Sequence, residues 1–307
     1  MIWTPGRLIY YGIFEALRKS ASPRKLPVPV ISVGNLTMGG TGKTPLVIHI
    51  ARNMPGAAVL SRGYGGRGRG TREVFVDSDP RDVGDEPVMM RIKANCPVFV
   101  GRNRVESGQK AIAGGARALI LDDGFQYWNI VKDTEILVFS AKELEKGVHL
   151  LPWGRWREPL SAVKRADIAI INYKLAPIPE GLPDIGIRAI AMRYRLETDL
   201  TGKRVFGFCG LGDNGSFVGA LRAAGAEIVG FRGFRDHHPY SVSEIERILA
   251  DAEQLNAIAI TSSKDMVRIP GDLRAGLMEL GIMVELHPAG ALSFEHDQFV
   301  LGNPVSG

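Results

Sequence analysis

The stretch TMGGTGKT, residues 37–44, decides the fold, because it joins an expected strand to an expected helix. The apolar run 28–33 before it is typical of a buried strand, and residues 45–53 after it favour a helix. Glycines at such a junction let backbone N–H groups converge on phosphate oxygens, and the helix amino terminus adds a favourable dipole. We therefore expect a loop that binds a nucleoside triphosphate, formed by Gly39, Gly40, Thr41, Gly42, Lys43 and Thr44.

Two side chains of this loop carry specific chemistry. Lys43 supplies a cation to the β- and γ-phosphates, and the hydroxyl of Thr44 is a ligand for Mg²⁺. The loop departs from the strict pattern at its first position, which is Thr37 rather than glycine. A glycine-rich turn with a chance lysine is the alternative, and the order of strand, loop and helix argues against it.

A carboxylate that orients the metal is expected at the end of a neighbouring strand. Asp122 and Asp123 follow the apolar run 118–121 and so meet this requirement. We predict that Asp122 and Asp123 join Thr44 in holding Mg²⁺, and that they act in catalysis together with Lys43. The simpler alternative is a surface Asp-Asp-Gly turn.

The rest of the chain repeats the alternation of apolar runs and helical stretches. Further strands are expected at 57–60, 97–100, 118–121, 136–139 and 168–171, with helices at 104–114 and 159–166. This alternation predicts an α/β fold with a P-loop NTPase-like parallel sheet. After a proline-rich stretch at 176–183, strands are expected again at 204–209, 227–231 and 257–261. We place a core domain at 1–200 and a second, smaller α/β domain, which closes the cleft, at 201–307.

Composition narrows the class of protein. Of 307 residues, 45% are hydrophobic and 23% are charged, which excludes a disordered or collagen-like chain. Two cysteines, Cys96 and Cys209, are too few for a disulfide framework or a cysteine-rich zinc site. The formal net charge of +5 favours an anionic partner: nucleic acid, nucleotide, phosphorylated substrate or acidic membrane surface.

Residues 1–20, MIWTPGRLIYYGIFEALRKS, are aromatic, basic and amphipathic. Arg7 and Glu15 interrupt the apolar run, which is shorter than the roughly 18–20 residues that a membrane-spanning helix needs. An interfacial helix and a helix packed on the domain surface are both consistent with this pattern.

Two other glycine-rich motifs compete for a function. GLGDNG, residues 210–215, matches a dinucleotide fingerprint, but the next expected strand ends in Phe231 and Arg232 instead of the acidic residue that holds a ribose. The Gly/Arg loop, residues 61–72, is similar in composition to RNA-binding segments. Because it directly follows an expected strand, we favour a loop that recruits phosphate and keep nucleic-acid binding as the alternative.

Several motifs taken in order resemble one family, the tetraacyldisaccharide 4′-kinases, which use ATP to phosphorylate the 4′-hydroxyl of a tetraacylated glucosamine disaccharide 1-phosphate. The resemblance covers most of the chain, and several independent motifs in one order are more specific than any one alone. It rests on residues 34–37 leading into the P-loop, 61–65, 84–87, 122–126, 157–160, 164–167, 236–241 and 264–265.

The resemblance implies an ATP- and Mg²⁺-dependent kinase of lipid A biosynthesis, peripheral on the cytoplasmic face of the inner membrane. Its partners would be the lipid A disaccharide 1-phosphate precursor and the anionic inner-membrane surface, reached through residues 1–20, with no nucleic acid and no evident protein partner. His237 from the second domain would approach the acceptor as a catalytic residue. The substrate-binding residues of the cleft would be Arg62, Asp85, Glu86, Gln126, Arg157 and Glu158.

The sequence departs from the family pattern at Asn103, which the pattern gives as an aspartate thought to help the histidine deprotonate the sugar hydroxyl. An amide can orient a hydroxyl but cannot accept its proton, so Asn103→Asp should raise the rate. The alternatives are His237 acting alone, another carboxylate such as Asp85, and a slower enzyme or one with another acceptor. We favour activity at a reduced rate.

Two smaller departures are Tyr127, in place of a histidine, and Ser263, in place of a glutamate whose loss is expected to weaken ionic docking of the domains.

Two other functions stay open at this point. One is a P-loop kinase or ATPase that acts on another acceptor, and the other is a nucleic-acid-binding module that uses the Gly/Arg loop.

Overall fold

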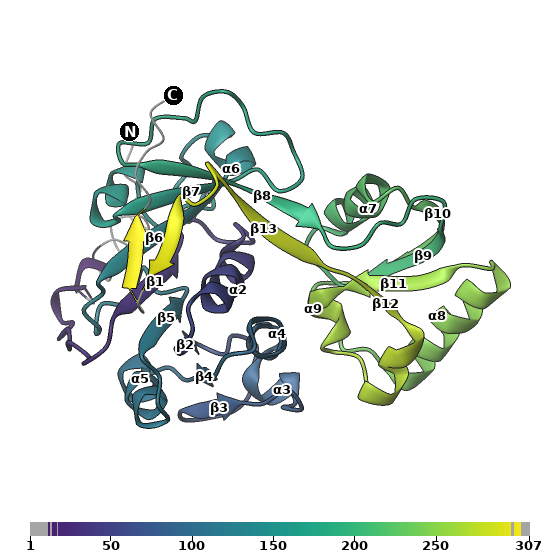
Figure 1. Ribbon diagram of the computed structural model, residues 1–307, viewed down its shortest axis with the longest axis horizontal. Coiled ribbons are helices and arrows are strands. Elements are labelled where there is room, and N and C mark those ends of the chain that lie inside the picture. Colours follow the sequence, from purple (N-terminus) through teal and green to yellow (C-terminus); the bar gives the residue numbers. More distant parts are fainter. Residues whose placement is uncertain (1–11, 13, 17, 296–297, 302–307) are drawn as a thin grey trace.

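The computed structural model describes residues 12, 14–16, 18–295 and 298–301. Figure 1 shows two bodies of unequal size, joined by the strands β8 (Ala189–Leu196) and β13 (Ile282–His287). These strands pair antiparallel, so the chain leaves the larger body and returns to it along one ladder. Residues 282–287 therefore belong to the larger sheet, and the division of the chain at residue 200 stays a proposal.

The larger body is built on a nine-stranded sheet with the order β13-β8-β7-β6-β1-β5-β2-β4-β3. All neighbouring strands from β8 to β4 run parallel, and the two edge strands, β13 and β3, are antiparallel to their neighbours. This arrangement confirms the parallel sheet that the sequence predicts. The other strands are β1 (Val30–Gly34), β2 (Ala57–Ser61), β3 (Arg72–Val74), β4 (Val98–Val100), β5 (Ala118–Asp122), β6 (Thr134–Ser140) and β7 (Ile168–Asn172).

Helices cover both faces of this sheet, which explains why its central strands are continuous apolar runs. Side chains of β1 alternate between the faces: Ile31 and Val33 pack with α2 and α4, whereas Val30 packs with α5. The helices of this body are α2 (Lys43–Asn53), α3 (Pro80–Val83), α4 (Asp85–Ala94), α5 (Arg104–Ala113) and α6 (Ala141–Glu145). The helix expected at 159–166 is a 3₁₀ helix, Leu160–Arg165.

The smaller body has a four-stranded parallel sheet with the order β10-β9-β11-β12. Its two main helices, α7 and α8, contribute to separate hydrophobic clusters on the sheet. Its elements are β9 (Arg204–Cys209), α7 (Asn214–Ala223), β10 (Glu227–Gly233), α8 (Val242–Gln254), β11 (Ile258–Ser262), α9 (Ser263–Met266), a 3₁₀ helix (Gly271–Gly276) and β12 (Met278–Leu280). The expected second α/β domain is confirmed in this body.

The first and the last described segments of the chain both pack on the larger body. A short antiparallel hairpin, β14 (Leu292–Glu295) with β15 (Gln298–Leu301), follows β13. Near the other end, residues 12, 14–16, 18 and 19 are helical, and the Phe14 ring meets Trp128 edge to face with centroids 5.0 Å apart. The interfacial helix predicted at 1–20 lies mostly outside the described residues. Within the described part of the chain, no helix is both long and apolar enough to cross a membrane.

Candidate active site

The glycine-rich loop lies at the carboxyl edge of the large sheet, between β1 and α2. α2 begins at Lys43, and Gly42 before it has a φ of 102°, a conformation that side-chain-bearing residues rarely adopt. A Cβ at Gly42 would also lie 2.2 Å from the side-chain amide of Asn172 on β7. Asn172 in turn donates to the carbonyl of Thr41 at 2.9 Å. A residue of β7, two strands away from β1, therefore holds the loop in a shape that only glycine permits.

Lys43 meets the acidic pair that follows β5. Its Nζ lies 3.3 Å from Asp123 Oδ1, and Arg157 Nη1 lies 3.4 Å from the other oxygen of the same carboxylate. Burial alone would raise the pKa of Asp123, but the charges of Lys43 and Arg157 outweigh it and hold the pKa below its usual value. Asp123 is thus ionised and lies between two cations.

Asp122 has the opposite environment, although it is the adjacent residue. Burial, together with the negative charges of Glu86 and Asp123, raises its pKa to about 6. Its Oδ2 accepts a hydrogen bond of 2.9 Å from Ser61 at the end of β2. The charges of Asp123 and Glu86 therefore both act on Asp122, and Glu86 also contacts the hydroxyl of Thr44.

The predicted substrate-binding residues Gln126, Arg157 and Glu158 form one network next to this pair. Arg157 donates to Gln126 Oε1 at 3.2 Å, and Gln126 Nε2 donates to Glu158 Oε1 at 3.0 Å. Glu158 is only 2% exposed and is also paired with Arg165. Because Glu158 is buried and fully engaged, it orients Gln126 and Arg157, and Arg157 is the member of the network that reaches the acidic pair.

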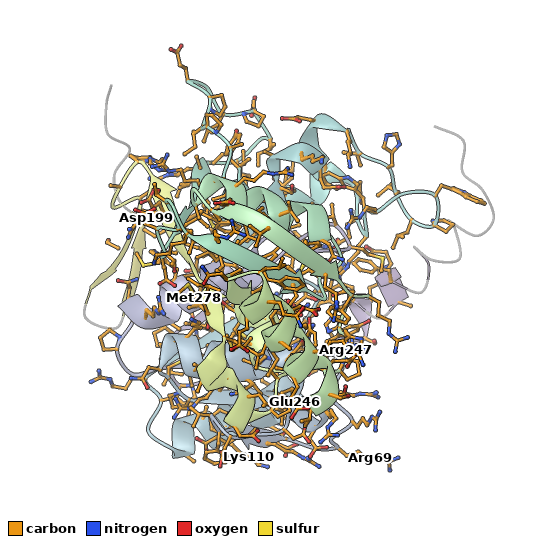
Figure 2. The ribbon with its side chains drawn as sticks, turned by 90° about the vertical axis from the view of Figure 1, so that its right-hand side faces the viewer. Arg69, Lys110, Asp199, Glu246, Arg247 and Met278 are labelled. Carbon is orange, nitrogen blue, oxygen red and sulfur yellow. The ribbon has the colours of Figure 1, made fainter. Side chains whose placement is uncertain are left out.

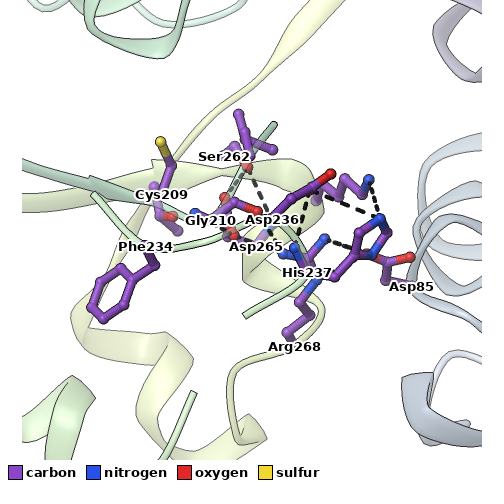
Figure 3. Close-up of polar contacts among 12 residues, drawn as sticks. Asp85, Cys209, Gly210, Phe234, Asp236, His237, Ser262, Asp265 and Arg268 are labelled. Carbon is purple, nitrogen blue, oxygen red and sulfur yellow. Dashed lines mark hydrogen bonds and ion pairs between the residues drawn. The ribbon is translucent and has the colours of Figure 1, made fainter. Parts of the chain in front are cut away.

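The second half of the candidate site lies where α4 meets the smaller body (Figure 3). Asp85 Oδ2 lies 3.0 Å from His237 Nδ1 and accepts a hydrogen bond of 2.8 Å from Arg268 Nε. Burial would raise the pKa of Asp85, but the hydrogen bond from His237 and the charge of Arg268 hold it well below its usual value. With Asp85 ionised, the proton between the two groups lies on Nδ1 of His237.

Asp265 fixes the guanidinium that reaches Asp85. It is fully buried, and its Oδ1 accepts from Arg268 Nη1 at 3.0 Å, from the Tyr240 hydroxyl at 2.9 Å and from the Gly210 backbone N–H at 2.9 Å. Arg268 therefore lies between two buried carboxylates, one from each body. The GLGDNG motif contributes to this structural contact, and the carboxylate of Asp213 caps α7 where a dinucleotide phosphate would have to bind.

Glu86 connects the two halves of the site. Its Oε2 accepts from the Thr44 hydroxyl at 3.2 Å, and its Oε1 lies 3.3 Å from Lys264 Nζ in the smaller body. Since Glu86 adjoins Asp85, the P-loop threonine and the histidine of the smaller body flank the same two residues. The junction also has an ion pair at its far side, with Lys93 Nζ 2.5 Å from Glu279 on β12. Ser263 donates a hydrogen bond to Glu279. We expected Ser263, which stands in place of a glutamate, to remove a negative charge from the junction, and Glu279 supplies a negative charge there.

The structure gives Asn103 a local role. Its side chain is exposed and caps α5, with Oδ1 accepting from the Glu106 backbone N–H at 3.3 Å. Two carboxylates lie near His237: Asp85, one of the alternatives that the sequence left open, is 3.0 Å from Nδ1, and Asp236 is 3.8 Å from Nε2. Tyr127 also acts at this helix start, because its hydroxyl accepts the Arg104 backbone N–H at 3.0 Å.

The Gly/Arg loop is folded against the larger body. The N–H of Arg67 donates to the carbonyl of Arg81 and that of Gly68 to the carbonyl of Asp82, both at 2.9 Å. Lys110 on α5 donates to the Thr71 carbonyl at 3.2 Å, and Figure 2 shows Lys110 and Arg69 at the same end of the molecule. Arg62, predicted to bind substrate, lies at the start of the loop, directly after β2.

Sequence reasoning missed several residues of the site. Arg268 and Glu279 stand in no motif, and Arg268 lies in a turn two residues after the end of the short helix α9. Lys132 was missed as well: its Nζ donates to the Gly124 carbonyl at 2.7 Å and lies 2.5 Å from Glu135. Lys132 therefore supports the backbone of the turn that presents Asp122 and Asp123.

Comparison with known proteins supports one interpretation of this geometry. Residues 4–294 match a family model described as tetraacyldisaccharide-1-P 4′-kinase. A tetraacyldisaccharide 4′-kinase of Paramagnetospirillum magneticum is 37% identical over 270 residues, covering 84% of this chain and 82% of that protein. The corresponding protein of Rhodospirillum rubrum is 35% identical over 292 residues, covering 91% and 87%.

A solved structure is similar over nearly the whole length. The crystal structure of "apo" form LpxK from Aquifex aeolicus in complex with ATP superimposes with a TM-score of 0.77. The two sequences are 29% identical, and the match covers 92% of this chain and 94% of that one. The expected P-loop kinase fold is thereby confirmed.

Proposed function

Since the chain belongs to the tetraacyldisaccharide-1-P 4′-kinase family, we infer that it transfers the γ-phosphate of ATP to the 4′-hydroxyl of a tetraacylated glucosamine disaccharide 1-phosphate. This is a step of lipid A biosynthesis. The geometric observation that carries the inference is the junction at residues 85–86. There Glu86 contacts Thr44 of the P-loop while Asp85 contacts His237, so a phosphate-binding loop and an acid–base pair lie on either side of one point.

We propose that the loop 39–44 binds the phosphates of ATP. The backbone N–H groups at the start of α2 and the Lys43 ammonium are suited to this, because phosphoryl transfer mainly requires positioned donors and neutralised charge. The ion pair between Lys43 and Asp123 keeps the ammonium at the loop before nucleotide binds. Arg157, which also contacts Asp123, would supply a second cation on the other side of that carboxylate.

We propose a Mg²⁺ site formed by Thr44, Asp122 and Asp123. Oxygen ligands suit this hard cation, and a divalent cation would counter the burial and the negative charges of Glu86 and Asp123 that raise the pKa of Asp122. Asp123 Oδ1 is buried and accepts no hydrogen bond from the described residues, so it could bind the ion once the Lys43 ammonium, 3.3 Å away, turns to the phosphates. The described residues contain no group of three or more His, Cys, Asp or Glu side chains that could hold a metal ion, so the proposed site would need water and the nucleotide phosphates as further ligands. Such an ion would neutralise charge on the phosphates.

We propose that Asp85 and His237 act on the acceptor hydroxyl. Asp85 holds the proton on Nδ1 of His237, so the Nε2 lone pair is the basic atom available to the hydroxyl. Lys264 Nζ lies 3.3 Å from that Nε2 and would have to be displaced by the acceptor, while Glu86 gives the ammonium another partner. Arg268, buried between Asp85 and Asp265, keeps Asp85 ionised throughout.

We also propose a peripheral position on the cytoplasmic face of the inner membrane. The support is the amphipathic, basic sequence of residues 1–20 and the lipid nature of the acceptor. Arg18 and Lys19, which are exposed in the described part of this segment, carry the charge that favours an anionic leaflet.

The test of the function is transfer of labelled γ-phosphate from ATP to the tetraacylated disaccharide 1-phosphate in detergent with Mg²⁺, with the product identified by mass spectrometry. We expect one added phosphate, located on the 4′-hydroxyl of the distal sugar. Release of inorganic phosphate without labelled lipid would instead indicate an ATPase or a kinase for another acceptor.

A further inference from the structure

Arg104, the first residue of α5, is a buried cation without a counter-ion in contact. The residue is only 7% exposed, and its Nε finds no acceptor among the residues that the structure describes. The side chain also makes no ion pair within that part of the chain. Burying an unpaired charge is costly, and burial does lower the pKa of this guanidinium. A buried polar group without a partner calls for an explanation, and a bound ligand is one that the position of Arg104 supports.

Two neighbours hold Arg104 in one conformation. Its guanidinium carbon lies 4.9 Å from the centre of the Tyr127 ring, a cation–π contact, and the hydroxyl of the same tyrosine accepts the Arg104 backbone N–H at 3.0 Å. Asn103 caps the helix immediately before it. The arginine is thus positioned before any ligand arrives, which reduces the entropy that binding would cost.

The strand order places this cation opposite the P-loop. β1, β5, β2 and β4 are consecutive neighbours in the sheet, and their carboxyl ends carry Lys43, the Asp122–Asp123 pair, Arg62 and Arg104 in that order. Both aspartates and Arg62 act electrostatically on Arg104. A phosphate above the acidic pair would therefore meet Lys43 from one side and two arginines from the other.

We propose that Arg104, assisted by Arg62, is a phosphate-binding residue of the active site, held in place by Tyr127. Guanidinium groups suit this role because their planar set of donors matches phosphate oxygens. The inference rests on the proposed kinase function. Two phosphates can supply the oxygen: the group that ATP transfers, and the 1-phosphate that the acceptor already carries.

The experiment compares Arg104→Met with wild type on two acceptors, the disaccharide 1-phosphate and the same disaccharide without its 1-phosphate. On the natural acceptor we expect a loss in kcat/KM of about 100-fold, the usual cost of removing one positioned donor. If the ligand is the transferred group, the loss lies in kcat and is the same on both acceptors. If the ligand is the 1-phosphate, the loss lies in the KM of the acceptor and disappears when the 1-phosphate is absent.

Two further variants separate this role from a structural one. Arg62→Met removes an exposed side chain, so it leaves the fold intact, and we expect a loss of about tenfold, the effect of one weaker charge-assisted contact. The matched control is Arg102→Met, which changes an exposed arginine in the short loop between β4 and α5, two residues before Arg104. This variant should retain wild-type kinetics. Arg104→Lys keeps the charge but not the planar fork and should recover only part of the activity.

Wild-type kinetics for Arg62→Met together with folded, fully active Arg104→Met would overturn the proposal. The proposal would also be overturned if kcat/KM of Arg104→Met falls only in proportion to the folded fraction, measured by thermal unfolding, while the kinetics of Arg62→Met are unchanged. Failure of the wild-type protein to phosphorylate either acceptor would instead count against the kinase function itself.

Discussion

The two halves of the active site are held together in different ways. The P-loop half comes from short segments at the ends of adjacent parallel strands, so backbone ladders fix Lys43 and Asp123 relative to each other. The junction half unites Asp85 with Arg268, 183 residues away, through side chains that extend from two separate sheets. Geometry in the first half follows from secondary structure, whereas geometry in the second depends on charge.

This difference has a functional consequence. A phosphate-binding loop must be rigid, because its value lies in donors that are already positioned. An acid–base pair formed across two bodies can open and close with them, since contacts between side chains are easier to break than a sheet. Variants of the two halves should therefore fail differently: loss of rate with an intact fold in one, and loss of docking together with rate in the other.

The largest expected effect is on the P-loop half. Lys43→Ala removes the cation that would meet the transferred phosphates, and we expect phosphate transfer to fall by about 1000-fold or more. The fold should remain, because among the described residues the lysine side chain pairs only with Asp123, and the loop is held by Asn172 and the sheet. Lys203→Ala, which changes an exposed lysine of the smaller body, is the matched control. Unchanged transfer in Lys43→Ala, measured with labelled ATP, would show that this loop is not the nucleotide site.

The second effect is on the junction half, through Asp85→Asn. The change removes one carboxylate from a buried pair and leaves Arg268 partly uncompensated, so we expect a loss of about 3 kcal/mol in the free energy of unfolding at pH 7. The folded-state pKa of Asp85 lies below its ordinary value, so its contribution is complete above the unfolded pKa of about 3.9 and is lost as the pH falls through the folded pKa. Urea unfolding at several pH values measures the difference in the free energy of unfolding between the variant and wild type. By the same linkage, this difference should stay constant between pH 5 and 8 and shrink only in stronger acid.

Asp77→Asn, at an exposed position of the larger body, is the control for this measurement. A difference that already shrinks between pH 7 and 5 would mean that Asp85 does not have a lowered pKa and that charge does not hold the junction together.

The same contrast explains what could be predicted from the sequence. Local patterns identified β1, the loop 37–44, α2 and the acidic end of β5, because each depends on neighbours within a few residues. Helix α8 was not predicted, although Ser241 and Glu244 form a capping box at its start, which is a readable signal. The helix expected at 159–166 is present as a 3₁₀ helix at 160–165, and the pattern did not indicate which kind of helix forms, since short segments of both kinds share it.

Long-range pairings could not be predicted in this way. The ladder between β8 and β13 joins segments about ninety residues apart, and neither strand was expected. The partners of His237 and Arg268 depend on how the smaller body docks, which a single sequence does not encode in any local pattern. For this reason the residue facing His237 was sought at Asn103, whereas the structure places Asp85 there.

The smallest effect is expected at that position and separates the two interpretations. The sequence pattern predicts that Asn103→Asp raises the rate by restoring a base. The structure predicts kcat within about twofold of wild type, because aspartate caps a helix as well as asparagine does. His237 already has a carboxylate partner in Asp85, so a further carboxylate at residue 103, an exposed helix cap, is not needed to orient the histidine. Steady-state kinetics of Asn103→Asp decide between the two interpretations, with Asn95→Asp as a control at a helix end away from the site. A rise in kcat of about tenfold or more, the size expected of a restored base, would return the catalytic role to residue 103.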